Sequence, residues 1–249
     1  MTRWFPILLY HRILPVPAGP DPYRNCVSTA SFRSHLQWLL AHGYSSLPLT
    51  SDAVSPWQQR PGKHVAITFD DGYEDNYVHA WPLLREFGFT ATVFVITDCI
   101  GGMNDFDAGL GVAPARMLRP EQIREMHGHG LEIGSHSCSH PPSLIQLGEA
   151  HLRDELVRSR TELEELIQAP VTTFSYPHSR ADRRTEAAVK DAGYHLALAG
   201  EGFSFSRYRM HRVYAPAGDG AALARSVRLR QLKRLIRSAV FPRGAASRD

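Results

Sequence analysis

The sequence predicts an α/β fold in which parallel strands form a closed or nearly closed barrel, as in a TIM barrel. Short apolar runs typical of buried strands alternate with longer segments whose apolar residues recur at helical spacing. This alternation favours a parallel sheet. About seven such units fit into the 249 residues, and no internal sequence repeat is evident. A count of seven at this length indicates a barrel.

Each strand-like run is short and apolar, and each is followed by a polar or glycine-containing segment. The seven runs cover residues 5–10, 65–69, 91–96, 131–135, 172–176, 195–199 and 211–215.

The segments between the strands carry helical patterns. Segment 31–41 has apolar residues at helical spacing and ends at Gly43, and segment 120–127 starts with Pro120, which helices tolerate in the first turn. The full set of predicted helices is 31–41, 77–87, 120–127, 152–167 and 182–191.

Three polar connections interrupt this pattern. Residues 15–25 and 97–115 are rich in Gly, Pro and Asp, and we expect both on the rim of the active site. The second is long enough to form a lid or a substrate wall. Residues 56–63 form a third, proline-containing connection.

Composition places the chain among ordinary soluble globular proteins, since 43% of its residues are apolar and 21% are charged. Charge is uneven, however. Residues 221–249 contain eight basic residues and one acidic residue, whereas residues 1–220 carry a net charge of −4. We therefore expect a mildly acidic barrel domain over 1–220 and a basic C-terminal tail over 221–249.

The tail is predicted to form one amphipathic helix over 223–240. Its apolar stripe consists of Leu229, Leu232, Ile236 and Val240, and arginines surround it. A basic amphipathic helix can lie on an anionic membrane surface. The alternative is a terminal helix docked on the body with its charges in water. No nucleic-acid partner is expected, because no recognised binding motif accompanies the helix.

The first ten residues do not resemble a secretory signal. A short apolar run follows one early arginine and is interrupted at 10–12, where a signal would continue and present a cleavage site. No apolar stretch is long enough to span a bilayer. Cys26, Cys99 and Cys138 are an odd number without a C-x-x-C pair, which fits reduced thiols. The expected location is the cytoplasm, with a peripheral position at the inner membrane face if the tail binds lipid.

Two motifs follow predicted strands directly. Asp70 and Asp71 precede a glycine at the end of strand 65–69, and His136 and His140 follow strand 131–135. One carboxylate and two imidazoles suffice for a catalytic zinc site with an open position for water, and the other carboxylate is free to act as a base. Asp-Asp-Gly is often only a turn, and spaced histidines are common on surfaces. Their shared position at strand ends, where α/β barrels place active-site groups, favours a metal hydrolase.

At these residues the chain resembles the polysaccharide deacetylase family, carbohydrate esterase family four, which contains the chitooligosaccharide deacetylase homology domain. The matching segments are 67–72, 134–140 and 174–178. Segments 8–13 and 210–213 resemble the branch whose motif order is circularly shifted. The resemblance implies a deformed (β/α)7 barrel.

It also implies a ligand set for one divalent metal ion. Asp71, His136 and His140 would hold the ion, with Zn2+ favoured and Co2+ or Ni2+ as alternatives, and Asp70 would be the general base. The ion would acidify a water molecule and polarise an amide carbonyl. Cys138 lies between the histidines and either binds a soft metal or is a structural thiol; we favour the second role.

The leaving amine needs a proton from a general acid. In the circularly shifted branch this acid lies at the end of the first strand, which matches His11. A strand-end histidine bonded to a neighbour is the alternative interpretation. His211 is the second candidate and His178 the third.

The third motif would complete the pocket. Tyr176 and Pro177 would shape it, and the backbone N–H of His178 would face the developing oxyanion. Here the sequence departs from the family, which usually has an aromatic residue and a glycine after the proline and often an upstream arginine that steers the base. This chain has His178 and Ser179 there, and Arg180 comes after the motif.

The predicted activity is hydrolysis of an N-acyl group, with acetyl favoured, from an amino sugar of a polysaccharide, a lipid-linked glycan or a related glycoside. A second interpretation keeps the site and changes the substrate to a formyl amide or a cyclic amide such as a ureide. A third is a non-catalytic glycan-binding protein. Asp70 argues against the third, because a pure binder has no need of a base beside three ligands.

Overall fold

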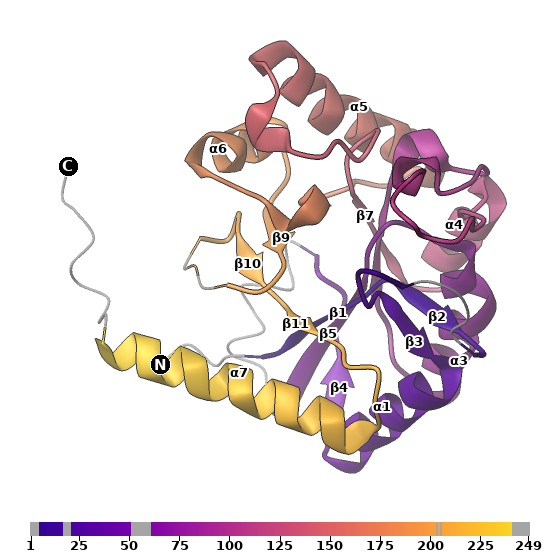
Figure 1. The fold of residues 1–249 in the computed structure, drawn as a ribbon, viewed down its shortest axis with the longest axis vertical. Helices are drawn as coiled ribbons and strands as arrows, with labels where there is room; N and C mark the ends of the chain where they lie inside the picture. The colour runs from indigo at the N-terminus through magenta and orange to yellow at the C-terminus, as the bar shows by residue number, and fades with distance from the viewer. Residues whose placement is uncertain (1–4, 17–20, 51–60, 203, 205, 241–249) are drawn as a thin grey trace.

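A parallel barrel forms the body of the protein (Figure 1). The computed structural model describes residues 5–16, 21–50, 61–202, 204 and 206–240. All seven predicted strand runs are strands, and each pairs in parallel with its neighbours. The barrel strands are β1 (Ile7–Tyr10), β5 (Lys63–Phe69), β6 (Thr92–Val95), β7 (Glu132–Ser135), β8 (Thr173–Ser175), β9 (Leu196–Ala199), β10 (Met210–His211) and β11 (Val213–Tyr214).

The last strand position closes the barrel. The strand order is β10-β9-β8-β7-β6-β5-β1-β11, so β10 and β11 occupy opposite ends of the hydrogen-bonded path. Only Arg212 separates them in sequence. The chain therefore pairs with β9 on one side, passes through Arg212, and pairs with β1 on the other. The predicted strand 211–215 is this broken strand, and the barrel has seven strand positions.

Three further strands were not predicted. β2 (Arg12–Leu14) and β3 (Cys26–Ser28) form a separate two-stranded sheet, and β4 (Tyr44–Ser46) pairs with β5. Each has only three residues, which is too short for an alternation pattern to be recognised.

Helices surround the barrel (Figure 1) and match the five predicted segments and the predicted tail helix. The α-helices are α1 (Thr29–Ala41), α3 (Trp81–Phe87), α4 (Pro120–Gly128), α5 (Glu149–Ile167), α6 (Arg183–Asp191) and α7 (Gly220–Val240). A π-helical turn, η2 (Asn76–Ala80), precedes α3, and short 3-10 turns cover η3 (Thr97–Cys99), η4 (Asp105–Asp107), η5 (Leu144–Gln146) and η6 (Pro177–Ser179).

Local signals set several helix ends. The Ser28 hydroxyl caps α1 by accepting the Ser31 N–H at 3.0 Å. The Asp182 carboxylate caps α6 in the same way, accepting the Thr185 N–H at 2.8 Å. Gly88 ends α3 with a φ of 67°, a left-handed conformation that favours glycine.

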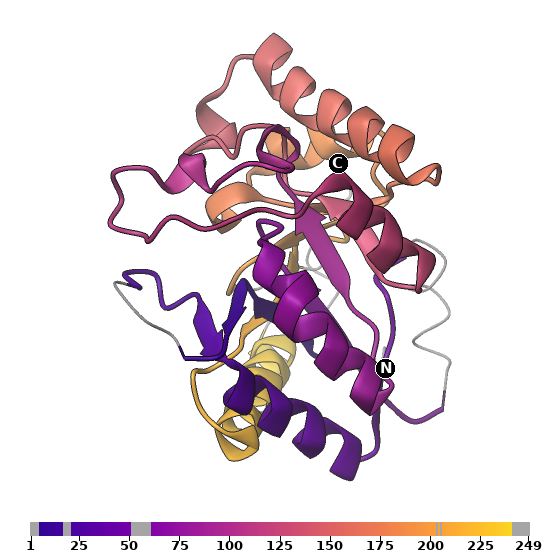
Figure 2. The same cartoon turned by 90° about the vertical axis from the view of Figure 1, so that its right-hand side faces the viewer.

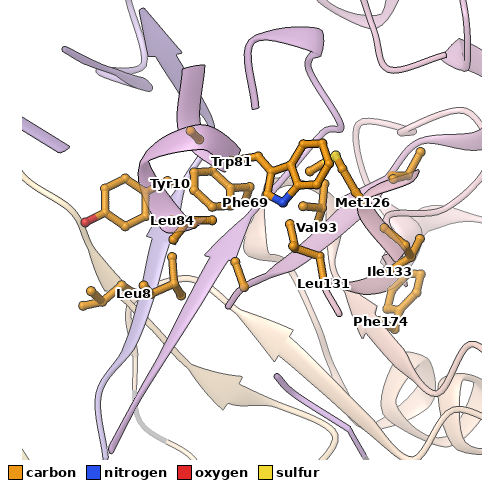
Figure 3. Close-up of a cluster of buried hydrophobic side chains, with 14 of the residues drawn as sticks. Leu8, Tyr10, Phe69, Trp81, Leu84, Val93, Met126, Leu131, Ile133 and Phe174 are labelled. Atoms are coloured by element: carbon orange, nitrogen blue, oxygen red, sulfur yellow. The ribbon is translucent and has the colours of Figure 1, made fainter. Parts of the chain in front are cut away.

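The core has two main parts, and a third small cluster consists of Tyr73, Ala115 and Met117. Apolar residues on the outer face of the strands pack against the helices, as Figure 3 shows for Phe69, Val93 and Ile133 with Trp81 and Met126. A smaller cluster fills the barrel itself and consists of Ile7, Leu49, Ala66, Phe94, Leu196 and Leu198. Gly134 is required here, because a Cβ at its position would lie 2.5 Å from the Phe94 ring.

The long loop 97–115 and residues 21–25, which precede β3, lie on the same side of the barrel (Figure 2). Both therefore lie on the predicted rim. The longer loop is held to the body by isolated bridges from Tyr73 to Met117 and from Met103 to Arg116, and the Asn104 side chain accepts the Ala115 N–H at 2.7 Å. Most of the third connection, 56–63, lies outside the described residues.

α7 is docked at its beginning and exposed further along. Leu223, Ala224 and Val227 are buried, whereas Leu229 and Leu232 are 54% and 53% exposed. The described side chains end at residue 233, so Ile236 and Val240 of the predicted stripe lie outside them. In the described part of the chain, none of the helices combines the length and apolar character that a bilayer crossing requires.

A buried histidine gives the fold a pH-dependent stability. The Tyr10 hydroxyl and His35 Nδ1 lie 3.0 Å apart in the core, and burial lowers the pKa of His35 from 6.5 to about 4. Below pH 6.5 the unfolded chain binds a proton at this histidine that the folded chain does not. The unfolding free energy should therefore fall as the pH drops from 6.5 to 4, by roughly 3 kcal/mol in total.

Urea unfolding of wild type and His35→Gln across this pH range measures the effect. The variant should lose this part of the pH dependence, while His129→Gln, a change of an exposed histidine, should keep it. If the unfolding free energy depended on pH equally in wild type and His35→Gln, His35 would not be the source of the effect.

Candidate metal centre and active site

A strained turn carries the two adjacent carboxylates. β1 and β5 pair with Tyr10 opposite Phe69, and the Asp70 N–H donates to the Tyr10 carbonyl at 3.0 Å. The chain then turns through Asp71 and Gly72, with φ of 73° and 82°. A Cβ at Gly72 would lie 3.3 Å from Val95. The turn directs both carboxylates to the ends of the strands, and Asp71 holds a backbone conformation that non-glycine residues rarely adopt.

The loop after β7 carries the two histidines. Ser137 and His140 also have positive φ, 68° and 56°. Serine hydroxyls hold this loop locally: Ser135 Oγ accepts the Ser137 N–H at 3.2 Å, and Ser137 Oγ accepts the His140 N–H at 3.1 Å.

A carboxylate from α5 supports the same loop from behind. The buried Glu155 accepts the N–H groups of Cys138 at 2.8 Å and Ser139 at 3.0 Å, and it also accepts the Ser139 hydroxyl. The Cys138 thiol points to the same helix, with Sγ 3.5 Å from the Glu155 carbonyl, and burial raises its pKa to about 12. Cys138 is thus a structural thiol, and Glu155 is a positioning residue that the sequence analysis did not identify.

Asp71, His136 and His140 converge on one point, with ligand atoms all within 4.8 Å of one another. Asp71 Oδ1 lies 3.2 Å from His136 Nε2 and 3.8 Å from His140 Nε2. His136 Nδ1 donates to the Ser175 carbonyl at 2.8 Å, which directs Nε2 at the Asp71 carboxylate. Two electron-rich atoms in this arrangement fit a shared cation.

Electrostatics agree with a ligand set. Burial would raise the pKa of Asp71, but the hydrogen bond from His136 and the nearby histidines lower it well below its usual range. Burial, followed by the charge of His136, lowers the pKa of His140 to about 3. At neutral pH the carboxylate is ionised and the His140 imidazole is neutral, which are the ligand forms that metals bind. Burial would lower the pKa of His136, but the charges of Asp70 and Asp71 raise it, so an ion that binds here would displace the proton on its Nε2.

Asp70 does not belong to that cluster and is instead held by an arginine. Arg212 Nη1 and Nη2 donate to Asp70 Oδ1 and Oδ2, both at 2.7 Å, and Ser175 Oγ donates to Oδ2 at 3.1 Å. Burial would raise the pKa of Asp70, but the charge and hydrogen bonds of Arg212 keep it below its ordinary value. Asp70 is therefore ionised. In the family an arginine often orients the carboxylate at this position. In this chain Arg212 contacts Asp70, whereas Arg180 is exposed.

His11 lines the same cavity as both carboxylates. It follows β1 directly, beside the end of β5, and the Asn76 side-chain amide donates to its carbonyl at 2.7 Å. Asp75 accepts the Arg12 Nε and the Ile13 N–H, each at 2.9 Å. These contacts anchor the end of β1 to Asp75 and Asn76, which follow the Asp-Asp-Gly motif. The π-helical turn η2 begins at this point. Such turns are frequent at functional sites.

The third motif lines the cavity as well. Tyr176 and Pro177 are buried, and the Tyr176 hydroxyl donates to the Tyr208 carbonyl at 2.8 Å. His178 is exposed, and its ring lies 4.6 Å from that of His140. His178 and Ser179 have φ of 53° and 61°, so the turn keeps a left-handed backbone where the family usually has glycine.

The structure does not bring His211 into the cavity. Its Nδ1 donates to the Gly200 carbonyl at 3.0 Å, and a Cβ at Gly202 would meet its ring. The reason is strand alternation: Arg212 points into the barrel, so its neighbours point outward. The geometry therefore gives no support to His211 as an acid candidate.

The cavity over these groups has a volume of about 300 Å3. Loop residues that the sequence analysis did not single out complete its wall. Its lining residues are His11, Tyr23, Asn25, Asp70, Asp71, Phe106, Asp107, His136, His140, Tyr176, His178, Ser179 and Tyr214.

The sequence is similar to those of known proteins. The model of the family described as polysaccharide deacetylase matches residues 58–197. The Bacillus subtilis protein YxkH, whose name refers to the polysaccharide deacetylases, is 33% identical over 224 residues, covering 87% of this chain and 74% of that protein. A Staphylococcus aureus poly-beta-1,6-N-acetyl-D-glucosamine N-deacetylase is 27% identical over 176 residues, covering 67% of this chain and 58% of that protein. The chain belongs to the polysaccharide deacetylase family.

Solved structures share the fold. The Streptococcus pyogenes deacetylase PplD, solved in complex with acetate, has a TM-score of 0.74 at 24% identity, covering 89% of this chain and 97% of that chain. IcaB from Ammonifex degensii has a TM-score of 0.74 at 24% identity, covering 90% and 95%. These similarities confirm the predicted barrel.

The ligand geometry predicts stoichiometric metal binding. Wild type loaded with Zn2+ and then dialysed should retain about one ion per chain, because three protein ligands meet at one point. Asp71→Asn should lose most of it, since a neutral amide replaces the charged ligand. Inductively coupled plasma mass spectrometry measures the content. Cys138→Ser is the control and should retain the ion, because the thiol faces α5. Loss of the ion from Cys138→Ser would contradict the assignment of Cys138 as a structural thiol.

Replacing the arginine should displace the Asp70 carboxylate. Arg212→Lys keeps the charge but loses the two-pronged contact, and if Asp70 is the base, its displacement should cost about 100-fold in kcat. Weaker stabilisation of the carboxylate also raises the pKa of Asp70, so the acid limb of kcat/KM should move to higher pH. A pH profile of deacetylation measures both effects. Arg180→Lys is the matched control, and an unchanged acid limb in Arg212→Lys would count against the role.

Proposed function

We propose that this protein is a metal-dependent N-deacetylase that removes acetyl groups from amino sugars in a glycan chain. The observation that carries the proposal is the side-by-side arrangement of an ionised carboxylate outside the ligand cluster, Asp70, and the Asp71–His136–His140 cluster in one cavity. Membership of the family gives the reaction class, and the S. aureus relative is an N-deacetylase of poly-beta-1,6-N-acetyl-D-glucosamine.

Asp71, His136 and His140 would hold one divalent ion. We favour Zn2+, with Co2+ or Ni2+ as alternatives, because one carboxylate and two imidazoles suit these ions. When bound, the ion makes water acidic near neutral pH and polarises the amide carbonyl.

The protein residues divide the proton transfers between them. Asp70, fixed in its ionised form by Arg212, accepts the proton of the attacking water. His11, on the wall of the same cavity, gives a proton to the nitrogen of the leaving amine. The His178 N–H faces the developing oxyanion, and Tyr176 and Pro177 shape the pocket.

Removal of His11 separates amide from ester hydrolysis. Acetate release from N-acetylglucosamine oligomers by metal-loaded His11→Gln should fall about 100- to 10,000-fold, because a poor leaving group needs the proton. Hydrolysis of an aryl acetate should fall much less, since a phenolate leaves unprotonated. His211→Gln, outside the cavity, is the control. Equal losses on both substrates in His11→Gln would argue against an acid. Formate release by wild type from N-formylglucosamine oligomers, without acetate release from the N-acetyl ones, would argue for the deformylase alternative.

We also propose that α7 holds the enzyme against an anionic membrane surface, at the inner face of the cytoplasmic membrane. The buried Leu223 and Val227 fasten the helix to the body, while Leu229 and Leu232 are exposed between the basic, exposed Arg228 and Lys233. Exposed leucines flanked by cations are typical of helices that lie in the lipid headgroup region.

Vesicle co-sedimentation tests this contact. Full-length protein should bind vesicles that contain anionic phospholipid more tightly than neutral vesicles. A Leu229→Ser, Leu232→Ser double variant should lose about tenfold in affinity, since two apolar side chains no longer enter the lipid. Val157→Ser, which changes an exposed apolar residue on α5, is the control. Equal binding by the double variant and wild type would refute the contact.

A further inference from the structure

We propose that Asp107 forms a subsite for a protonated amine inside the catalytic cavity. This inference rests on the proposed function and narrows the substrate: the enzyme takes neutral or amine-bearing glycan chains and disfavours sugars that carry phosphate. Asp107 belongs to the 3-10 turn η4 in the loop 97–115, and it lines the cavity together with its neighbour Phe106.

The position of the carboxylate is fixed by a buried residue. The Tyr73 hydroxyl donates to Asp107 Oδ2 at 2.9 Å, and Tyr73 is only 1% exposed. Tyr73 is held in turn by the bridge to Met117 and by the Arg12 guanidinium, which lies 4.8 Å from the centre of its ring. Asp107 thus has a fixed position in the cavity wall. Its side chain is half-buried and remains accessible to a ligand in the cavity.

Its charge balance sets Asp107 apart from the other two carboxylates that line the cavity. Asp70 has Arg212 as its partner, and Asp71 has His136 and His140. Within the described chain, by contrast, no basic side chain comes within 4 Å of the Asp107 carboxylate, so its negative charge is balanced by no ion pair there.

Burial is the largest cause of the raised pKa of Asp107. The hydrogen bond from Tyr73 opposes this shift, and the negative charge of Asp71 adds to it. A cation that enters the cavity would relieve this destabilisation of the ionised form.

The reaction supplies such a cation. In amide hydrolysis the water oxygen bonds to the acyl carbon, the C–N bond breaks, and the nitrogen takes up protons, so a neutral amide becomes acetate and an ammonium group. The ammonium beside Asp107 has two sources. One is the amine just released next to His11, and the other is a neighbouring sugar that was deacetylated earlier. A phosphate group would meet repulsion from the same carboxylate.

Competition between substrates tests the second source. Metal-loaded wild type should have a higher kcat/KM on partly deacetylated N-acetylglucosamine oligomers than on fully acetylated ones of the same length. Asp107→Asn should reduce that ratio about fivefold, the effect of one half-exposed ion pair. Asp105→Asn changes an exposed carboxylate of the same turn outside the cavity and should leave the ratio unchanged. Added salt should reduce the ratio in wild type but not in Asp107→Asn.

Calorimetric binding of glucosamine to the metal-loaded protein tests the first source and needs no turnover. Wild type should bind it about fivefold more tightly than Asp107→Asn, and N-acetylglucosamine should show no such difference. Thermal unfolding and metal content confirm that the variants are intact.

The outcomes separate the two proposals. If Asp107→Asn turns over substrate with an unchanged kcat/KM ratio between partly deacetylated and fully acetylated oligomers, and with unchanged affinity for glucosamine, the amine subsite is overturned. The proposed deacetylase activity would still stand. Asp107-dependent glucosamine binding without acetate release would support the subsite and overturn the proposed activity. A preference for phosphorylated over neutral sugars would overturn the subsite directly.

Discussion

The ion pair between Arg212 and Asp70 is the interaction on which the rest of this molecule depends. Both groups are almost completely withdrawn from water, so their desolvation is tolerable only because the geometry satisfies them. The guanidinium also donates to the Ala199 carbonyl at 3.1 Å and to the Ser175 hydroxyl at 2.9 Å. It therefore links the closing strand to β9, β8 and β5. Closure of the barrel and the charge on Asp70 are two results of one contact.

Backbone strain is concentrated where the candidate metal ligands lie. Of the seven non-glycine residues with positive φ in the described part of the chain, five belong to the three loops of the site: Asp71, Ser137, His140, His178 and Ser179. Each such residue costs about 1–3 kcal/mol and persists only where its surroundings fix it. Glu155 supplies that constraint for the histidine loop by accepting two of its N–H groups. α5 thus helps to hold the geometry of a site that it does not line.

Local sequence information was enough for the barrel strands, the α-helices and the grouping of Asp71, His136 and His140, because each depends on short-range patterning. It missed the three-residue strands β2, β3 and β4. The arginine was missed for a different reason. The segment 210–213 was singled out, but His211 received attention as the group with acid–base chemistry. Only the break between β10 and β11 determines which of the two neighbours points inward. Glu155 was likewise one charged residue among many on a long helix, and its role depends on which helix face meets the loop. Asp107 required the fold of a long loop, which periodicity does not describe.

The broken strand also shapes how the chain reaches its native state. Asp70 and Arg212 are 142 residues apart in sequence, so the contact that completes the barrel is among the least local in the molecule. Contacts of this kind form slowly, because a long stretch of chain must be ordered first. Until Met210–Tyr214 is in place, the open edges of β1 and β9 can pair with other chains, and Asp70 lacks its arginine partner. The same five residues that bring Arg212 to Asp70 thus also cover both edges of the sheet.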